Sequence, residues 1–216
     1  RTPSAPVLLG TRSLSQYSTR VMASGNYAYV TDPFDGMFIV DVSIPSSPFL
    51  AGSFSGEDIG DLYISGNYAY LTADTKLKIV DISDPSSPGI VANYELPSFA
   101  KSVFVKSNYA YVGVSRSGLM IFDISEPSNP QPVGSVSTGD YSGDVTVAGD
   151  YAYLSGTGGF ALIDVSNPAA PSQVGTYAFT YTQNEPPLAA NGNDVFVPYY
   201  YGGLEIVDVS TPAAPS

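Results

Sequence analysis

The 216-residue sequence contains no cysteine, no histidine and no tryptophan. Without cysteine there is no disulfide framework, so the redox compartment cannot be read from the chain. Without histidine and cysteine the usual ligands of zinc and copper are missing, and serine–histidine or cysteine–histidine catalysis is excluded. Any enzymatic chemistry would therefore have to use carboxylates, as glycoside hydrolysis does.

Charged residues are also scarce, at 13% of the chain against a usual ~25%. The net charge is −12, and all eight basic residues lie at or before Arg116. Residues 117–216 hold ten acidic residues and no basic one. Because nucleic acids and anionic lipids are bound through basic patches, this charge distribution predicts that neither is a partner.

No apolar run approaches the ~20 residues of a spanning helix, so we expect no membrane insertion. The chain begins with Arg1 rather than Met and shows no signal peptide, which predicts a processed protein or an excerpt of a longer chain. The acidic, lysine-poor composition, rich in Ser, Thr and Tyr, is typical of exported proteins. We therefore expect an extracellular or cell-surface location.

A repeat of about forty residues runs through the whole sequence. The string LKIVDISDPSSP at 77–88 returns in close variants, with its aspartate at Asp41, Asp81, Asp123, Asp164 and Asp208. The steps between these aspartates are 40, 42, 41 and 44 residues. GNYAYV at 25–30 and its variants precede each string except the last, which has NDVFV at 193–197. The period is that of a four-stranded propeller blade.

Each unit predicts four short strands bounded by turn residues. In the second unit these are 61–65, 67–72, 77–83 and 90–96, all rich in β-branched or aromatic residues. No helical segment lies between them to make a parallel crossover, so antiparallel pairing is predicted. In NYAY the two tyrosines share one face of the strand and the alanine takes the other, so that adjacent sheets interdigitate.

The repeated aspartate has two interpretations. Because it ends an apolar run before S-x-P, it is placed to accept hydrogen bonds from backbone N–H groups of the following turn. The alternative is a ring of aspartate ligands. We favour the turn-capping role, because it accounts for the residue at every repeat.

The strings (L/M/F)xIVD(V/I)SxPxxP, with GNYAYV upstream, resemble the LVIVD repeat family, and the match covers nearly the whole chain in five copies. The resemblance implies an exported bacterial or archaeal β-propeller and carries no catalytic residues. We therefore predict one all-β domain over 1–216, a five-bladed β-propeller of four-stranded antiparallel blades. The N-terminal strand, about 7–16, is expected to close the last blade. TPSAP at 2–6 duplicates TPAAP at 211–215, which leaves fraying, truncation or closure of a neighbouring molecule open.

In a propeller, two kinds of loop lie at one mouth of the central channel: those from the fourth strand of one unit to the first strand of the next, and those from the second strand to the third. These loops vary between repeats, and binding usually occurs in variable loops on a fixed frame. Acidic and aromatic residues gather in these loops, and carboxylates and aromatic rings suit a glycan or a peptide. In PYYYGG at least one tyrosine should be exposed, since neighbouring residues point to opposite faces. The candidate ligand-binding residues are Asp58, Asp61, Phe99, Tyr141, Asp144, Glu185, Tyr199, Tyr200 and Tyr201.

Repeat alignment places Arg20, Ser102, Asp144 and Leu188 at the position of Asp61. No cofactor is predicted, but Asp58, Asp61, Asp140 and Asp144 stand in glycine-bearing loops that offer the oxygen ligands calcium prefers. Their spacing does not match a twelve-residue calcium loop. The carboxyls of Glu57, Asp58, Asp61 and Asp144 are the candidates for a catalytic pair.

The sequence favours a non-enzymatic structural or adhesive interaction module, which binds a protein partner or assembles with itself. Two alternatives remain. One is a carbohydrate-binding module that uses the acidic and aromatic face to hold a surface glycan, and the other is a carboxylate-dependent glycan hydrolase or lyase.

Overall fold

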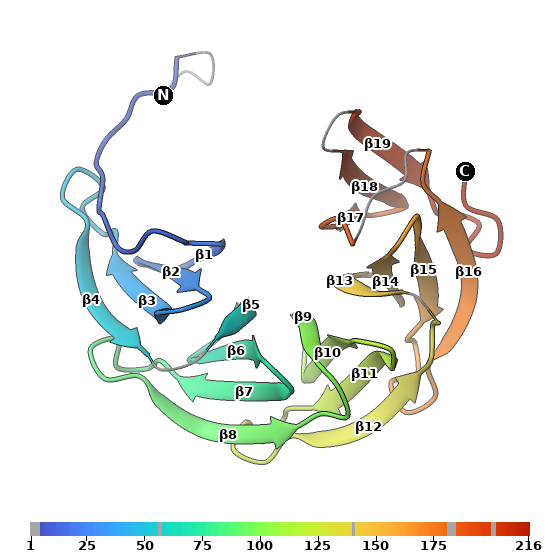
Figure 1. Cartoon of the computed structure of the whole chain (residues 1–216), viewed down its shortest axis with the longest axis horizontal. Coiled ribbons are helices and arrows are strands. Elements are labelled where there is room, and N and C mark those ends of the chain that lie inside the picture. Colours follow the sequence, from blue (N-terminus) through green and yellow to red (C-terminus); the bar gives the residue numbers. More distant parts are fainter. Residues whose placement is uncertain (1–4, 56–57, 140, 181–184, 200–201) are drawn as a thin grey trace.

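The computed structural model describes residues 5–55, 58–139, 141–180, 185–199 and 202–216. Within these ranges the chain forms strands and turns only, so it includes no helix that could span a membrane. The strands form five separate antiparallel sheets, each built from one repeat. Figure 1 shows these sheets arranged as the blades of a β-propeller around a central channel.

The blades follow one another in chain order. The first contains β1 Arg20–Ser24, β2 Tyr27–Asp32, β3 Gly36–Asp41 and β4 Phe49–Phe54. The second contains β5 Ile59–Ser65, β6 Tyr68–Ala73, β7 Lys76–Asp81 and β8 Gly89–Glu95. The third contains β9 Ala100–Lys106, β10 Tyr109–Val114, β11 Gly118–Asp123 and β12 Gln131–Val136.

The fourth blade contains β13 Tyr141–Ala148, β14 Tyr151–Gly156, β15 Gly159–Asp164 and β16 Ser172–Ala178. The fifth has three strands, β17 Ala189–Asn191, β18 Asp194–Tyr199 and β19 Gly203–Asp208. In every blade the first strand lies beside the channel, and in the four-stranded blades the last strand lies on the rim (Figure 1). The strands predicted for the second unit are confirmed to within a few residues at their ends.

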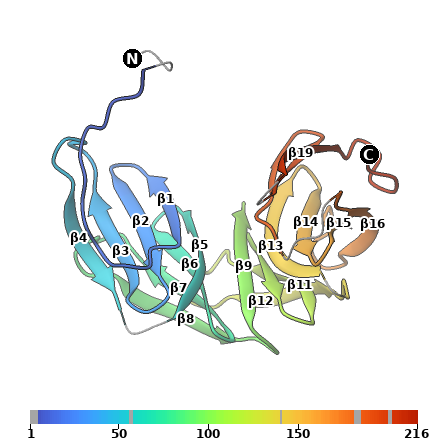
Figure 2. The same cartoon turned by 45° about the horizontal axis from the view of Figure 1, so that its top comes forward.

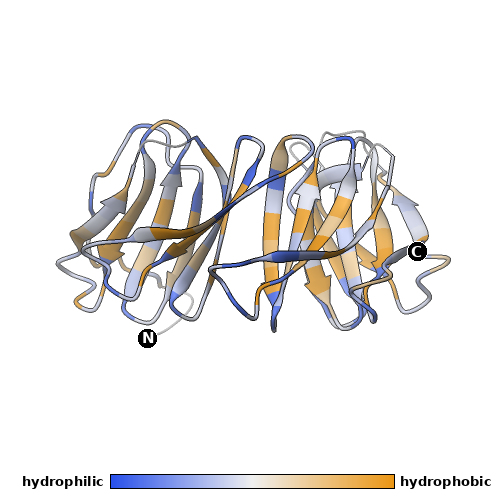
Figure 3. Ribbon diagram, turned by 90° about the horizontal axis from the view of Figure 1, so that it is seen from below, coloured by the Kyte–Doolittle hydropathy of each residue, from blue (hydrophilic) through white to orange (hydrophobic). Residues whose placement is uncertain are grey.

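The hydrophobic core lies between blades rather than within one of them. Tyr29 and Ile39 of the first blade pack in one cluster with Leu62 and Leu71 of the second. Tyrosines of the repeated NYAY face the following blade and the intervening alanines face the preceding one, since Tyr70 and Ala69 belong to different clusters. Large and small side chains therefore interdigitate as predicted, and Figure 3 shows apolar residues along the strands of the blades.

The repeated aspartate caps a turn in all five repeats, as predicted. One carboxylate oxygen accepts a hydrogen bond from the backbone N–H two residues later, at 2.7–2.9 Å, in each copy. These hydrogen bonds, first from the backbone of Ser83 and then from its hydroxyl, lower the pKa of Asp81. The aspartates therefore fix the passage from the third strand to the fourth.

The predicted closure of the last blade by the N-terminal strand is wrong. Described residues 5–16 form no strand, and the fifth sheet ends at β19 without a fourth partner. In Figures 1 and 2 the N-terminal segment runs beside the first blade, and β19 stands across an opening in the ring. Strand pairing requires backbones within about 5 Å, and the arc of the five blades does not bring these two segments together.

The N-terminal segment nevertheless occupies the place of a rim strand. A side chain at Gly10 would collide with the carbonyl oxygen of Pro45, in the turn of the first blade. Gly52 and Gly134 stand in the same relation to Pro85 and Pro168 of the blades that follow them. Residues 7–16 are therefore docked on the first blade as a rim strand docks on its successor, but none of the described strands pairs with them.

The opening leaves two blade faces uncovered. Ile39, Ile79 and Ile121 have exposed fractions of 0% between their blades, whereas Ile206 at the same repeat position is 58% exposed. On the other side of the opening, Val21 is 66% exposed, although its counterpart Leu62 is 3% exposed. The fifth and first blades therefore each present half of an interface that the chain forms elsewhere.

A matched pair of substitutions tests where the core lies. Ile121→Ala removes a fully buried side chain and should lower the free energy of unfolding by about 2–5 kcal/mol. Ile206→Ala makes the same change at an exposed copy and should cost less than about 1 kcal/mol. Urea unfolding measures both values, and equal losses would contradict the open ring.

Candidate functional site

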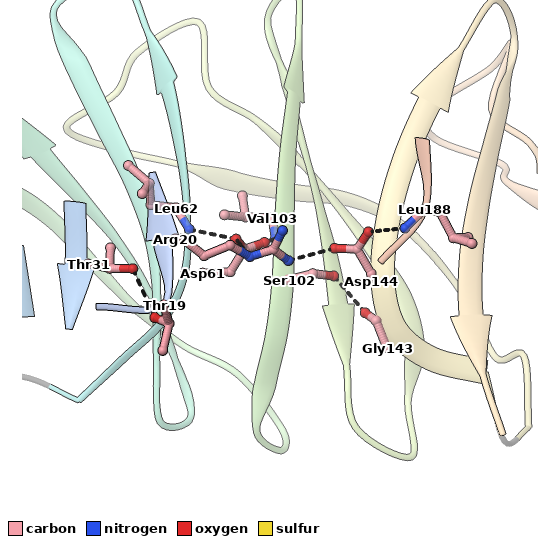
Figure 4. A network of polar contacts seen from close by, with 10 residues as sticks. All are labelled: Thr19, Arg20, Thr31, Asp61, Leu62, Ser102, Val103, Gly143, Asp144 and Leu188. Carbon is pink, nitrogen blue, oxygen red and sulfur yellow. Dashed lines mark hydrogen bonds and ion pairs between the residues drawn. The ribbon is translucent and has the colours of Figure 1, made fainter. Parts of the chain in front are cut away.

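Five equivalent positions of the repeat meet around the channel. They are Arg20, Asp61, Ser102, Asp144 and Leu188 (Figure 4). The first four lie in the first strand of their blades, and Leu188 directly precedes β17. The repeat alignment predicted this set, because each stands at the start of the innermost strand. Four of the five side chains are polar, so the channel is lined by a hydrogen-bonded layer at this level.

Three of these residues connect the second, third and fourth blades, each to the blade that follows it. Asp61 Oδ2 accepts a hydrogen bond from the Val103 backbone N–H at 3.0 Å. The Ser102 hydroxyl donates to the Gly143 carbonyl at 2.7 Å, and Asp144 Oδ2 accepts from the Leu188 backbone N–H at 2.7 Å. The acids of the channel thus satisfy backbone groups of the neighbouring blade that would otherwise be buried without a partner.

Arg20 joins two of these acids from opposite sides of the channel. Its Nε lies 3.0 Å from Asp61 Oδ1, and its Nη2 lies 2.9 Å from Asp144 Oδ1. Asp144 belongs to the fourth blade and Arg20 to the first, so this ion pair spans the channel. The side chains of Asp61 and Asp144 are 7% and 12% exposed, against 41% for Arg20.

A second ion pair also joins blades that are not neighbours. Lys101 Nζ in the third blade lies 3.1 Å from Glu185 Oε2, in the segment before β17. Both side chains are more than 30% exposed, so the pair adds little stability, about 0–1 kcal/mol. The side chain of Glu185 also packs over Gly143.

The two pairs border a shallow recess of about 340 Å³ at the channel mouth. Its lining residues are Thr19, Arg20, Lys101, Gly143, Asp144, Glu185 and Pro187. The recess therefore presents two cations and two carboxylates, all of them already paired across it. A ligand held here would have to exchange its own charges or hydroxyl groups for these contacts.

Burial dominates the electrostatics of Asp61. Desolvation raises its pKa to about 6, although Arg20 and the Val103 N–H favour the charged form and oppose this rise. For Arg20, burial lowers the pKa, but the nearby carboxylates Asp61 and Asp144 outweigh it and the net shift is upward. Arg20 therefore stays charged, and Asp61 changes its protonation state in mildly acidic solution.

Asp32 holds the first pair of channel-mouth loops together. It is fully buried, and its Oδ1 accepts from the backbone N–H groups of Phe34 at 2.8 Å and Asp35 at 3.0 Å. Its Oδ2 accepts from the Tyr17 N–H at 3.1 Å and from the Ser15 hydroxyl. The hydrogen bond from Ser15, followed by those from the backbone, lowers the pKa of Asp32.

Of the other predicted site residues, Asp58 and Phe99 lie together. Both line a recess of about 290 Å³ with Asp74, Lys101 and Ser115, and Phe99 is 57% exposed. Backbone hydrogen bonds from Ala100 to Asp74 and from Ser115 to Phe99 join the two kinds of loop that form this recess. The predicted meeting of these loops at one mouth is therefore observed here.

Two predicted aromatic residues lie inside the structure. Tyr141 is half-buried and packs against the cluster between the third and fourth blades. Tyr199 is 9% exposed, its hydroxyl donates to Glu205, and its ring lies 6.1 Å from that of Phe179. Tyr199 therefore belongs to the core between the fourth and fifth blades. Tyr200, Tyr201, Asp140 and Glu57 lie outside the described residues.

Among the described residues, no group of three or more acidic side chains is arranged to hold a metal ion. Two calcium candidates, Asp61 and Asp144, face the guanidinium of Arg20. Sequence reasoning missed the roles of Arg20 and Lys101, because it treated this face as acidic. For Arg20 the signal was present in the repeat alignment, which placed it at the position of Asp61 and Asp144.

The chain belongs to the LVIVD repeat family. The family model matches residues 16–55, 57–95, 99–138, 139–179 and 187–216, one match for each blade. No curated protein matches the sequence.

Solved structures with low sequence identity share the fold. A functionally unknown protein from Desulfotomaculum acetoxidans is 12% identical, with a TM-score of 0.75 over 93% of this chain and 68% of its own. The β-propeller domain of Myceliophteria thermophila Cps50 (Swd1) is 16% identical, with a TM-score of 0.69 over 94% of this chain and 69% of its own. The designed protein Ika8 is 15% identical, with a TM-score of 0.69 over 88% of this chain, which spans only 57% of Ika8.

The raised pKa of Asp61 predicts a specific pH dependence. Between pH ~4, where the carboxyl titrates in the unfolded chain, and pH 6, the folded chain binds more protons. Ionisation of Asp61 should therefore lower the free energy of unfolding as pH rises through this window, by up to about 3 kcal/mol.

Urea unfolding from pH 4 to pH 7 measures this contribution as the difference between the native chain and Asp61→Asn. The native chain should lose stability relative to the variant as the pH rises. Asp58→Asn, which changes an exposed carboxyl, serves as the matched control. A native chain that gains stability relative to Asp61→Asn over the same window would contradict the assignment.

Proposed function

We propose that the chain is a non-enzymatic interaction module of an extracellular or cell-surface protein, and that the loops at the channel mouth contact a protein partner. One observation carries the proposal. Tyr17 and Phe34 are 59% and 71% exposed, and their rings pack edge to face with centroids 5.3 Å apart. Exposed aromatic rings on a fixed frame are the residues that most often anchor protein interfaces.

The loops that carry this aromatic pair are held in place by a buried side chain. The buried carboxylate of Asp32 accepts hydrogen bonds from the backbone of both Tyr17 and Phe34. The pair is therefore preorganised, which reduces the entropy lost when a partner binds. The corresponding loops of the other repeats differ in sequence, so the blades share a frame and the first repeat supplies the distinctive contact.

The two acids of the channel already have hydrogen-bond and ion-pair partners, which supports a role without catalysis. Asp61 and Asp144 accept backbone hydrogen bonds from neighbouring blades, and both pair with Arg20. A glycosidase needs its two carboxyls on either side of the scissile bond. Here the guanidinium of Arg20 lies between them, so a sugar would have to displace Arg20 first.

A second candidate, carbohydrate binding, is favoured by the recess beside Phe99. The exposed ring of Phe99 lies with the carboxyls of Asp58 and Asp74 and the ammonium of Lys101 around a recess of about 290 Å³. An aromatic platform beside charged hydrogen-bonding groups suits a sugar ring and its hydroxyls. The extracellular location is proposed from the acidic, lysine-poor composition.

The test measures binding of the purified chain to envelope proteins of the producing cells and to an array of purified glycans. The double variant Tyr17→Ala, Phe34→Ala should weaken binding to the envelope proteins by at least ~10-fold, because both anchors are lost. Phe49→Ala should leave binding unchanged, since Phe49 is 53% exposed but lies on the rim strand β4.

Protease treatment of the envelope should abolish the binding. Binding to glycans that is lost in Phe99→Ala would establish the second candidate instead. Turnover of a glycan that is abolished by Asp61→Asn or Asp144→Asn would contradict the non-enzymatic role. Failure to bind either surface would contradict both binding functions.

A further inference from the structure

The third strand of the fifth blade presents an apolar face that is covered in every other blade. Leu204 and Ile206 are 60% and 58% exposed on β19. Met37, Leu77, Leu119 and Phe160 at the position of Leu204, and Ile39, Ile79, Ile121 and Leu162 at that of Ile206, all have exposed fractions of 0%. In those four blades the following blade covers them.

Across the opening, the first blade presents the complementary face. Val21 is 66% exposed on β1, and Ala28 and Val30 on β2 are half-buried. Their counterparts in the second blade are Leu62, Ala69 and Leu71, with exposed fractions of 3%, 0% and 0%. These residues pack against the preceding blade. The chain therefore ends its arc with two halves of the same repeated interface.

The strands at the opening are complementary in the same way. Residues 7–16 sit on the first blade as a rim strand without a partner, and Val7 and Leu8 are 76% and 79% exposed. β19 is a third strand without a rim strand. Ser216 exchanges backbone hydrogen bonds with Asp208 at 2.7 and 3.0 Å, which corresponds to the first rung of a rim strand such as Asp164 with Ser172.

The curvature of the arc decides what fits this opening. Nearly the whole chain, 94%, superposes on 69% of the β-propeller domain of Cps50, and 88% superposes on 57% of Ika8. The five blades therefore follow an arc that leaves roughly a third or more of such a fold to be completed. A second copy of this chain would bring five blades into a space with room for two or three.

We infer that the open side of the ring receives two or three further blades of the LVIVD type, and that the first of them supplies the rim strand that pairs with β19. The first added blade covers Leu204 and Ile206, as the following blade does at every other position. The last added blade pairs its third strand with residues 7–13, whose place on the first blade is already that of a closing strand. This inference does not rest on the proposed contact at the channel mouth.

The chain itself supplies the test segments, because its repeats are interchangeable in register. Ser216 corresponds to Gln131, Gly89 and Phe49, the first residues of three rim strands. Appending residues 132–166, 90–166 or 50–166 after Ser216 thus gives chains of six, seven and eight repeats. Each leaves the final rim strand to residues 7–13, because the sequence TPSAP at 2–6 matches the motif that precedes the other rim strands.

Amide hydrogen exchange of residues 7–13 is the readout. The form with seven or eight repeats should protect these amides at least ~100-fold more than residues 1–216 alone, because they gain a paired strand. In that form Ile206→Lys should lower the unfolding temperature, whereas in the 216-residue chain it should be tolerated at its 58% exposed position. Protection in neither form, or in the six-repeat form only, would overturn the inference.

If the longer forms aggregate, the 216-residue chain provides a second test. In this chain the amides of residues 7–13 should exchange faster than those of the equivalent rim strand β16, at every protein concentration. Protection at low concentration would show that the five blades close on themselves. Protection that grows with concentration would show that a second copy covers the opening. Either result would overturn the proposed occupant.

Discussion

Contact between successive blades is the constraint on which this structure depends. Each sheet is apolar on both sides, so no blade can bury its core alone, and stability comes from each face meeting the next. The residues that perform this task are completely buried between blades and mostly exposed at the opening, as Ile121 and Ile206 show. The same side chain at the same repeat position is therefore core where another blade packs on it and surface where none does.

The channel adds a polar layer to this apolar stacking. Asp61, Ser102 and Asp144 each bond to backbone groups of the next blade, so the innermost strands are held in register with one another. Arg20 and Lys101 then connect blades that are not neighbours in the ring, first to fourth and third to the segment before the fifth. Burial of Asp61 makes this layer sensitive to pH near 6, because the carboxyl of Asp61 that pairs with Arg20 gains or loses its charge there.

The strands, their antiparallel order and the capping aspartates could be predicted from the sequence because they follow from local spacing. The strand period, the turn residues and the paired tyrosines all act within one repeat. The fate of residues 7–16 could not be predicted in this way. Their pattern is that of a rim strand whether or not a partner is present, and closure depends on small angles between blades summed around the ring.

The candidate site was predicted only in part for similar reasons. The set that meets at the channel followed from repeat alignment, but the partners of Arg20 lie 41 and 124 residues away in the chain and depend on the curvature of the ring. For Tyr199 the alternation of the strand held a usable signal, since it shares a face with the buried Val195 and Val197. The aromatic pair Tyr17 and Phe34 needed the structure, because the hydrogen bonds of Asp32 that position both residues join two loops that are separate in the sequence.

The distance across the opening is the most direct measurement of this architecture. The chain has no native cysteine, so spin labels placed through Thr11→Cys and Leu204→Cys would be unique, and both positions are exposed. In the open ring the two labels should lie well beyond the roughly 5 Å backbone spacing of paired strands. A single short distance typical of neighbouring strands, in a dilute sample of the 216-residue chain, would contradict the open ring.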